Sequence, residues 1–470
     1  MKNRSQILIA FFWIFSIVTF TLFEANSSDV SAAVPKMLMV YSKLATDRTP
    51  FYRVWSGAAW GSEIPMSTTS VDVRQIVVKC ARFKEECIAV TNTPNVAGGS
   101  YIAAQVWNGT SWSATTTIEN TFNSIYRNFD LEYENGTDRA ILVTASDLSD
   151  PVYSIWNGST WTATSSINTP FSGRTYVVEL VSQRFSTSTK IAMIISGINE
   201  LYGMEWDGSN WNNLGITSMW DYNGPSVGKK EVDVAYESMS GAAIFAWSNA
   251  IDTTSIYYKR WNGNSFTASS TISISTMGGA GEWIRLAANP YSATNTMMLG
   301  VYDAGNDINT AFWDGSAWTV HSEHDAANEN ILNMTFDVAF LNASTSGKGY
   351  LAYGNAATVS RKQWTGNDWS SASTAGDDTA LPILDSSYEQ EAMQLLTYQD
   401  STSASDDITE SHIIDGSATW VADAQIWAGA VIAAPVGFRI DMEPSRFFTY
   451  PTFTQSAYRF FENADNTTAG

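Results

Sequence analysis

The sequence predicts an all-β fold, a seven-bladed β-propeller built from four-stranded antiparallel blades. Two observations predict it. A short turn motif, Trp-[Asn/Asp/Ser/Thr]-Gly-x-x-[Trp/Phe], occurs seven times, at spacings of 52, 49, 50, 55, 52 and 51 residues. Each copy is flanked by short runs with the period-2 alternation of strands, and four such runs in a repeat of about 50 residues are the pattern of a propeller blade. The leading tryptophans of the motif are Trp55, Trp107, Trp156, Trp206, Trp261, Trp313 and Trp364.

Each repeat supplies its four strands in a fixed order. The first is a short candidate for the innermost strand, such as FDLEY or VDVAY, and the second is continuously apolar, such as AILVTA. The third is aromatic and β-branched, as in SIYYKRW, and leads into the motif. Asn-Gly or Asp-Gly at that point is the strongest short hairpin signal, because the turn needs positive φ. The fourth is rich in Ser and Thr, as in SWSATTTI, which suits an outer strand whose edge faces water.

Strands from the two ends of the chain are expected to close the ring, which spans residues 37–400. The first copy begins in mid-blade, because Met37–Ser42 is typical of an apolar second strand and no innermost strand precedes it. Residues Glu391–Gln399 have the pattern of an innermost strand with no apolar strand after it. Together the two segments complete one blade, which gives seven. An eight-bladed ring is the alternative, and it needs the weak copy Ile413–Trp420, in which Ile replaces the leading Trp.

The N-terminal residues 1–33 are predicted to be a signal peptide. Lys2 and Arg4 precede an apolar run that extends from Ile7 to Phe23, and small residues at positions 31–33 offer a cleavage site. An uncleaved anchor is the alternative, because the run is long for a signal. The mature protein is therefore expected to be secreted or held at the cell surface, with no membrane segment after cleavage.

The net charge limits the classes of possible partner, and the two cysteines indicate a disulfide across one hairpin. The net charge is −21, and no run rich in Lys or Arg occurs, which excludes nucleic acid as an expected partner. Cys80 and Cys87 are the two cysteines, and a hairpin around Phe83 and Lys84 would place them opposite each other. A cross-strand disulfide is then expected, as exported proteins allow, although two small buried residues are the alternative.

Two resemblances follow from these motifs. Residues 37–400 resemble a seven-bladed β-propeller of an exported, bacterial cell-surface protein. The turn motif is similar to the Asp box of sialidase-like propellers, S-x-D-x-G-x-x-W, but here Asp or Asn directly precedes Gly, so the similarity implies the architecture and not sialidase activity. Residues 401–470 are expected to be a C-terminal extension. Its last sixteen residues, QSAYRFFENADNTTAG, resemble segments that open β-rich modules of large bacterial surface proteins, which implies the start of a truncated module.

A ring of polar side chains is the first candidate site. The second residue of each expected innermost strand is polar and has apolar neighbours, and charges near an apolar interior persist only when they are paired or solvated. Such a ring could bind a ligand in the central channel, or it could be a paired charge belt that fixes the register of the blades. Its members are Lys79, Asp130, Glu179, Asp233, Arg285, Asp337 and Gln394.

The motif tryptophans and the histidines each allow two interpretations. A Trp exposed on every blade could stack on sugars, but identical repetition favours a structural role in which the rings pack between blades. His321 and His324 form the one close histidine pair, and residues three apart on a strand face opposite ways, so no metal site is expected there.

The motifs that are absent limit the function. The sequence contains no Gly-x-Ser-x-Gly elbow, phosphate loop or dinucleotide fingerprint, so no cofactor is expected. The first hypothesis is an exported, non-enzymatic propeller for ligand recognition, adhesion or structural spacing, with a glycan or a cell-surface protein as its partner. The alternative is a glycan-active hydrolase that uses the channel carboxylates, which would need two of them about 5–9 Å apart.

Overall fold

The architecture is that of a computed structural model, in which the chain divides into residues 1–33 and residues 34–470. All of the described residues lie in the second unit, so the predicted signal peptide falls outside them. The described residues are 37–42, 48–56, 59–69, 72–73, 75–93, 101–119, 128–145, 150–169, 175–197, 200–214, 229–325, 335–341, 348–355, 358–374, 381–387, 392–398, 407–413, 420–428, 439–444 and 458–459. Within these ranges no helix is long and apolar enough to cross a membrane.

The described strands form eight antiparallel sheets, which we number in chain order. Sheet 1 contains β1 (Met37–Ser42), β2 (Phe51–Trp55), β3 (Ile64–Pro65), β32 (Arg439–Pro444) and β33 (Tyr458–Arg459). Sheet 2 contains β4 (Gln75–Cys80), β5 (Cys87–Thr93), β6 (Tyr101–Trp107) and β7 (Thr116–Glu119). Sheet 3 contains β8 (Phe129–Tyr133), β9 (Ala140–Thr144), β10 (Val152–Trp156) and β11 (Ser165–Ser166). Sheet 4 contains β12 (Thr175–Ser182), β13 (Ile191–Gly197), β14 (Leu201–Trp206) and β15 (Trp211–Asn213).

The other four sheets repeat this arrangement. Sheet 5 contains β16 (Val232–Tyr236), β17 (Ala243–Trp247), β18 (Ser255–Trp261) and β19 (Ser270–Ser273). Sheet 6 contains β20 (Gly281–Ala288), β21 (Met297–Asp303), β22 (Ile308–Trp313) and β23 (Trp318–Asp325). Sheet 7 contains β24 (Phe336–Phe340), β25 (Gly349–Asn355), β26 (Thr358–Trp364) and β27 (Ser373–Thr374). Sheet 8 contains β28 (Leu381–Ser387), β29 (Ala392–Tyr398), β30 (Asp407–Ile413) and β31 (Val421–Ala428).

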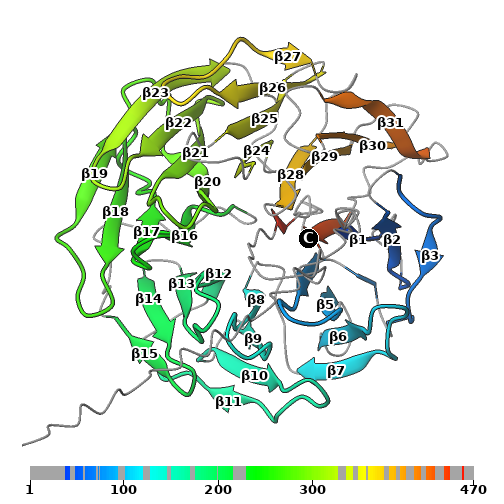
Figure 1. Cartoon of the computed structure of the whole chain (residues 1–470). Coiled ribbons are helices and arrows are strands. Elements are labelled where there is room, and N and C mark those ends of the chain that lie inside the picture. Colours follow the sequence, from blue (N-terminus) through cyan, green and yellow to red (C-terminus); the bar gives the residue numbers. More distant parts are fainter. Residues whose placement is uncertain are drawn as a thin grey trace, which may run out of the picture. The chain divides into compact units, whose positions relative to one another are not determined.

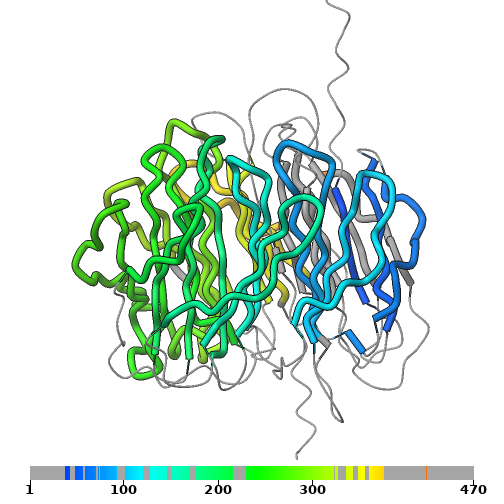
Figure 2. The backbone as a smooth tube through the Cα atoms, turned by 90° about the horizontal axis from the view of Figure 1, so that it is seen from below, coloured from blue at the N-terminus to red at the C-terminus, as the bar shows by residue number. Residues whose placement is uncertain are grey.

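The sheets surround a central axis as the blades of a β-propeller (Figure 1). Each inner strand contacts the inner strands of both neighbouring sheets, in the closed order β4, β8, β12, β16, β20, β24, β28, β32. Figure 2 shows the strands running roughly along the axis of this ring. The predicted all-β propeller of antiparallel blades is confirmed, with seven four-stranded sheets. An eighth sheet has five strands, so the ring holds eight sheets, the alternative that the sequence left open.

Strands from both ends of the chain close the ring, as predicted, but the closing strand differs from the expected one. Strand β1 pairs with β32, so the innermost strand of sheet 1 comes from Arg439–Pro444. The segment expected to close the ring, Glu391–Gln399, instead contains β29, the second strand of sheet 8. Four strands of the expected C-terminal extension, β30 to β33, belong to the sheets, so the propeller continues beyond residue 400.

The outer hairpins owe their geometry to the Asn-Gly and Asp-Gly pairs. The glycine takes positive φ in these turns, as in Gly109 at 93° and Gly158 at 96°. The preceding side chain closes the turn, because Asn108 Oδ1 accepts hydrogen bonds from the backbone N–H groups of Thr110 and Ser111 at 3.0 and 2.9 Å. Each motif is therefore a hairpin that its own residues specify.

The predicted disulfide is present. Cys80 and Cys87 are directly opposite each other in the β4–β5 pair, and their sulfur atoms are bonded. The connecting loop is longer than the expected two-residue turn, because β4 ends at Cys80 and β5 begins at Cys87. The disulfide thus closes a short loop at one end of sheet 2.

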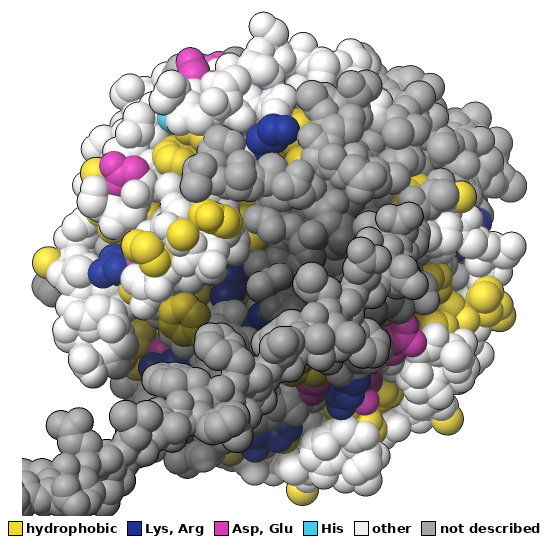
Figure 3. Space-filling model, in the orientation of Figure 1, with side chains coloured by type: hydrophobic (Ala, Val, Ile, Leu, Met, Phe, Trp, Pro, Cys, Tyr) yellow, Lys and Arg dark blue, Asp and Glu magenta, His cyan; other side chains and the backbone are white. Residues whose placement is uncertain are grey.

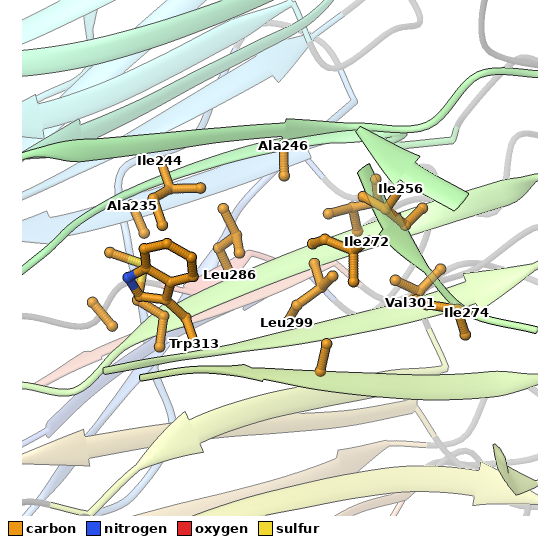
Figure 4. Close-up of a cluster of buried hydrophobic side chains, with 14 of the residues drawn as sticks. Ala235, Ile244, Ala246, Ile256, Ile272, Ile274, Leu286, Leu299, Val301 and Trp313 are labelled. Carbon is orange, nitrogen blue, oxygen red and sulfur yellow. The ribbon is translucent and has the colours of Figure 1, made fainter. Parts of the chain in front are cut away.

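The hydrophobic cores lie between neighbouring sheets. The close-up in Figure 4 shows one of them, where Ile244 and Ile256 of sheet 5 point toward Leu286 and Leu299 of sheet 6. Trp313 at the hairpin end of β22 joins the same cluster. A site formed between two sheets therefore depends on side chains that are about one repeat apart in the sequence.

Candidate functional site

In every sheet, one row of residues that pair across the strands passes through the residue three positions before the leading residue of the motif. We call it the register row. In sheet 5, for example, Tyr258 pairs with Ala246, which pairs with Asp233 on the inner strand. Inner-strand members alternate around the ring, with Asp in each odd-numbered sheet and another residue in each even-numbered one. In sheet order they are Asp441, Val77, Asp130, Glu179, Asp233, Arg285, Asp337 and Leu384.

This row corrects the predicted polar ring at two positions. Lys79 lies two residues beyond Val77, which is the row member in sheet 2. Gln394 is on β29, a second strand, and Leu384 occupies the row in sheet 8. The other five predicted members, from Asp130 to Asp337, do share the row. Lys79 was misplaced because a two-residue offset within an apolar strand leaves the same alternating pattern, and Gln394 because the strand predicted to be innermost is a second strand.

Two aspartates of the row, Asp130 and Asp233, bind the backbone of the next sheet. Asp130 accepts hydrogen bonds from the backbone N–H of its neighbour Leu131 and, at 2.7 Å, from Leu180 of sheet 4. Asp233 repeats the arrangement with Leu286 of sheet 6, also at 2.7 Å. Contacts between inner strands are more extensive at these odd-to-even interfaces than at the even-to-odd ones. The ring is therefore built from two-sheet units.

Cations occupy the spaces between the buried carboxylates. Lys230 Nζ lies 3.3 Å from Glu179 and 3.1 Å from Asp233. Arg285 lies 3.6 Å from Asp233 and 3.3 Å from Asp337. Burial raises the pKa of Glu179, and the nearby Lys230 opposes that rise.

Both charge signs are therefore engaged along this part of the row. Lys79 likewise pairs with Glu132 at 3.4 Å. The sequence pattern missed Lys230, which precedes β16 in the chain. Among the described residues, the row offers no open pair of carboxylates for acid–base chemistry.

The leading motif tryptophans tether neighbouring sheets through buried glutamates. Trp206 Nε1 donates to Glu134 of sheet 3 at 2.6 Å, and Trp313 Nε1 donates to Glu237 of sheet 5 at 3.0 Å. An arginine also binds each glutamate through two nitrogens, with Arg139 Nη2 2.6 Å from Glu134, for example. Through these contacts Trp206 and Trp313 each join two neighbouring sheets.

At its outer end, the register row alternates between large and small residues. The large members are in odd-numbered sheets and contact a motif Trp of the next sheet. Tyr52 lies 5.3 Å from Trp107 between ring centroids, and the Arg361 guanidinium lies 4.6 Å from the ring centroid of Trp420. The members in sheet order are Tyr52, Ala104, Tyr153, Gly203, Tyr258, Thr310, Arg361 and Ser411.

A groove of about 880 Å³ lies between the outer hairpins of sheets 2 and 3. Strand β6 carries the small residues Ala104 and Val106. The residue that corresponds to Val106 on β22 of sheet 6 is Phe312, which stacks on Trp364 with 4.6 Å between the ring centroids. The groove is lined by two half-buried tryptophans, Trp112 and Trp161, by the buried Trp156, and by Glu86. The hydroxyl-bearing residues along it are Ser111, Ser113, Thr116, Thr117, Ser159, Thr160, Thr162 and Thr164.

The groove joins the two most similar phrases of the sequence, WNGTSWSAT and WNGSTWTAT. The sequence pattern predicts structural hairpins for both copies and does not mark Glu86, Trp112 or Trp161 as site residues. The available signal was the small residue Ala104 at a position that Tyr52, Tyr153 and Tyr258 occupy in other copies of the repeat. That signal has a meaning only once the register shows that this strand faces the next hairpin.

The histidines lie at another even-to-odd interface, between sheets 6 and 7. His321 contacts Trp364, and its Nδ1 lies 3.3 Å from Asp368. His324 Nε2 lies 2.8 Å from Thr310 Oγ1, and burial lowers the pKa of His324 to about 3. The described residues contain no group of three or more His, Cys, Asp or Glu that could hold a metal ion. These histidines fill the interface between sheets 6 and 7, whereas the equivalent interface between sheets 2 and 3 contains the groove.

Comparisons with known proteins give distant structural similarities. No protein-family model matches the sequence, and no curated protein is significantly similar to it. SapL1 lectin in complex with α-methyl fucoside is 16% identical over 67% of this chain and 98% of that chain, with a TM-score of 0.36. The six-bladed propeller lectin of Aleuria aurantia, described with a fucose recognition mode, is 13% identical over 66% and 97%, with a TM-score of 0.36. NanB sialidase from Streptococcus pneumoniae is 9% identical over 77% and 80%, with a TM-score of 0.37. Similarities of this size carry no argument about the ligand or activity of this chain.

Proposed function

We propose that this protein is a non-enzymatic recognition propeller that binds a glycan in the groove between sheets 2 and 3. The observation that carries the proposal is the composition of that groove. It combines the indole rings of Trp112 and Trp161 with eight Ser and Thr side chains and one carboxylate, from Glu86. A concave site with aromatic walls and a few placed polar groups is the usual form of a small-molecule site.

A saccharide matches both parts of this lining. Its C–H faces pack against indole rings, and its hydroxyl groups donate to and accept from Ser and Thr. The volume of about 880 Å³ lies within the range typical of ligand sites. A flat protein surface matches it less well, because the walls are two hairpins that rise on either side. A glycan is therefore the favoured partner over a cell-surface protein.

The row of inner-strand carboxylates supports recognition over hydrolysis. Asp233 and Asp337 are engaged with Arg285, and Glu179 with Lys230. A retaining or inverting glycosidase needs one carboxylic acid and one free carboxylate on either side of a sugar. The groove itself has Glu86 as its one acidic residue. We therefore keep the hydrolase as the less favoured alternative.

The proposal includes export to the cell surface or beyond. It rests on the basic and apolar pattern of residues 1–33 and on the Cys80–Cys87 disulfide, since disulfides persist in oxidising compartments. Expression of the full chain in a bacterial host, followed by fractionation and N-terminal sequencing, tests it. Export is overturned if the protein stays in the cytoplasm with its first 33 residues intact.

A glycan array with two matched variants tests the binding function. Trp161→Ala removes a groove wall, whereas Trp318→Ala removes the equivalent motif residue between other sheets. We expect the wild type and Trp318→Ala to bind the same glycans and Trp161→Ala to lose at least tenfold in affinity. Absence of binding across a broad array, or equal loss in both variants, overturns the proposal.

A further inference from the structure

Glu86 presents one occupied and one open carboxylate oxygen at the wall of the groove. Its Oε1 accepts from Trp156 Nε1 at 3.0 Å and from Tyr133 Oη at 3.1 Å, and Lys84 Nζ lies 2.7 Å away. No hydrogen bond from the described residues reaches Oε2. The side chain is 12% exposed and lines the groove, so a ligand can reach that oxygen. Glu86 is thus a fixed acceptor with a free position.

The disulfide loop holds this acceptor in place. Glu86 directly precedes Cys87, and its backbone carbonyl accepts from Ala81 N–H at 2.8 Å. On the other side of the loop, Asp138 of sheet 3 accepts from the backbone N–H groups of Arg82 and Phe83 at 2.9 and 3.1 Å. The loop is therefore bonded at both ends and to the neighbouring sheet, and Glu86 loses little conformational entropy on binding.

The charges around the groove select against anions. Glu86 is the one charged residue of the lining, and Lys84, the cation beside it, is already paired with Oε1. An anionic ligand would bring a second negative charge toward Oε2 without a free cation to compensate it. The chain carries a net charge of −21, which adds a weaker repulsion at long range. On the face seen in Figure 3, the Lys and Arg side chains are dispersed and form no single patch.

We infer that the groove is specific for neutral saccharides and that Glu86 is its specificity-determining residue. This inference rests on the proposed glycan-binding function. Ligand hydroxyl groups donate to Oε2, which gives charge-assisted hydrogen bonds stronger than those of the neutral Ser and Thr hydroxyls. Sialylated and sulfated glycans are excluded by the same carboxylate. The tryptophans pack against the sugar face without selecting charge.

Glu205 is the matched control for this residue. It lies in sheet 4 and accepts from Trp261 Nε1 at 3.2 Å and Tyr236 Oη at 3.1 Å, and Lys190 Nζ lies 3.0 Å from its other oxygen. The same three donor types therefore surround Glu86 and Glu205. Glu205 does not line the groove. Glu205→Gln therefore reports the structural cost of weakening such a tether, without the ligand contact.

Titration calorimetry of the full chain measures the affinity for three kinds of ligand. The methyl glycosides of neutral hexoses are the expected ligands, N-acetylneuraminic acid is the anionic comparison, and a choline salt is the cationic one. We expect neutral sugars to bind, the acid to bind at least tenfold more weakly, Glu86→Gln to reduce neutral-sugar affinity at least tenfold, and Glu205→Gln to change it less than twofold. Equal affinity for the acid, preferential choline binding, or equal effects of the two substitutions overturn the inference while glycan binding itself stands. Failure of every sugar to bind overturns the proposed function as well.

Discussion

The interface between sheets 1 and 2 and the interface between sheets 2 and 3 use the same hairpin motif with opposite results. At the first, Tyr52 packs edge-on against Trp107 and Trp112, with centroid distances of 5.3 and 6.0 Å, and fills the space in front of them. At the second, Ala104 occupies the equivalent row position, and the groove lies in front of Trp156 and Trp161. At these two interfaces, the space beside the motif is filled where the row residue is Tyr52, and a groove lies beside the motif where the row residue is Ala104.

The same alternation governs the inner strands. At two odd-to-even interfaces a buried Asp accepts a backbone N–H from the next sheet, Asp130 from Leu180 and Asp233 from Leu286. At even-to-odd interfaces the inner strands are in less extensive contact. Contact between inner strands is therefore concentrated within two-sheet units, whereas the groove lies between two such units.

The largest expected effect comes from breaking a tight interface at its charged row. Asp233→Ala removes the acceptor of two backbone N–H groups and one of the two carboxylates beside each of Lys230 and Arg285, which keep Glu179 and Asp337. We expect the free energy of unfolding to fall by about 3–5 kcal/mol. Urea denaturation measures it, with the exposed Asp368→Ala as control. A loss no larger than that of the control would show that the row contributes little to stability.

Removal of the ring at the outer end of the row tests another odd-to-even interface, the one between sheets 1 and 2. Tyr52 is 6% exposed, and Tyr52→Ala leaves a cavity beside Trp107 and Trp112. We expect a loss of about 3 kcal/mol in the free energy of unfolding, in the range found for large aromatic truncations. Thermal and urea unfolding measure it, with the exposed Ile64→Ala as reference. Similar losses for both variants would contradict the proposed filling role.

The reverse substitution should convert the open interface into a closed one. Ala104→Tyr places a ring where sheets 1, 3 and 5 have one, and it should abolish binding of neutral glycans. We expect a cost of about 1–3 kcal/mol in stability, because Ala104 is buried and its surroundings must adjust. Calorimetric titration and urea unfolding measure the two effects, with Ala104→Ser as control. Unchanged glycan affinity in a folded Ala104→Tyr protein would place the site elsewhere.

The smallest effect is expected at Asp303, a buried carboxylate that forms no ion pair with any of the described residues. Asp303 is fully buried and accepts from backbone Gly305 and side-chain Asn309, and burial raises its pKa to about 6. Its folded form therefore binds a proton more tightly than the unfolded chain does, so it favours folding below pH 3.8 and loses that contribution as pH rises to about 6.

Asp303→Asn should remove this pH dependence. The amide keeps an acceptor for Gly305 and cannot titrate. We expect the stability difference between wild type and variant to change by at most about 2 kcal/mol between pH 4 and pH 7. Urea unfolding at the two pH values measures it. A difference that is constant with pH would show that Asp303 does not titrate in this range.

Much of the fold could be predicted from the sequence, and the failures have local causes. The leading Trp and the Gly of each motif define a hairpin within six residues, so the blades were correctly predicted. The disulfide of Cys80 and Cys87 was correctly predicted because the two cysteines flank another short hairpin. The closing strand was misplaced because Glu391–Gln399 and Arg439–Pro444 both alternate in polarity, and alternation alone does not identify the partner of a strand. The strict alternation of Asp around the ring requires an even number of sheets, but it becomes visible only in the correct register.

The candidate site was predictable only in its parts. Five of the seven predicted ring residues share one row, while Lys79 and Gln394 do not. The sequence supplied the Trp, Ser and Thr side chains of the groove but gave no reason to separate one copy of the motif from another. Glu86 was inconspicuous, because its position in the groove follows from the disulfide loop and from a hairpin in the next sheet.

By itself, the sequence determined the strands, the hairpins and the repeat, because each depends on residues that are neighbours in the chain. Only the tertiary structure decided that β32 closes the ring and that the groove lies between sheets 2 and 3. The pairing of β1 with β32 joins residues about 400 positions apart, and hydrogen-bond register is set by that contact. The groove is lined by residues of the hairpins of sheets 2 and 3, which lie one repeat apart in the chain, and the space between two packed sheets depends on both sides at once.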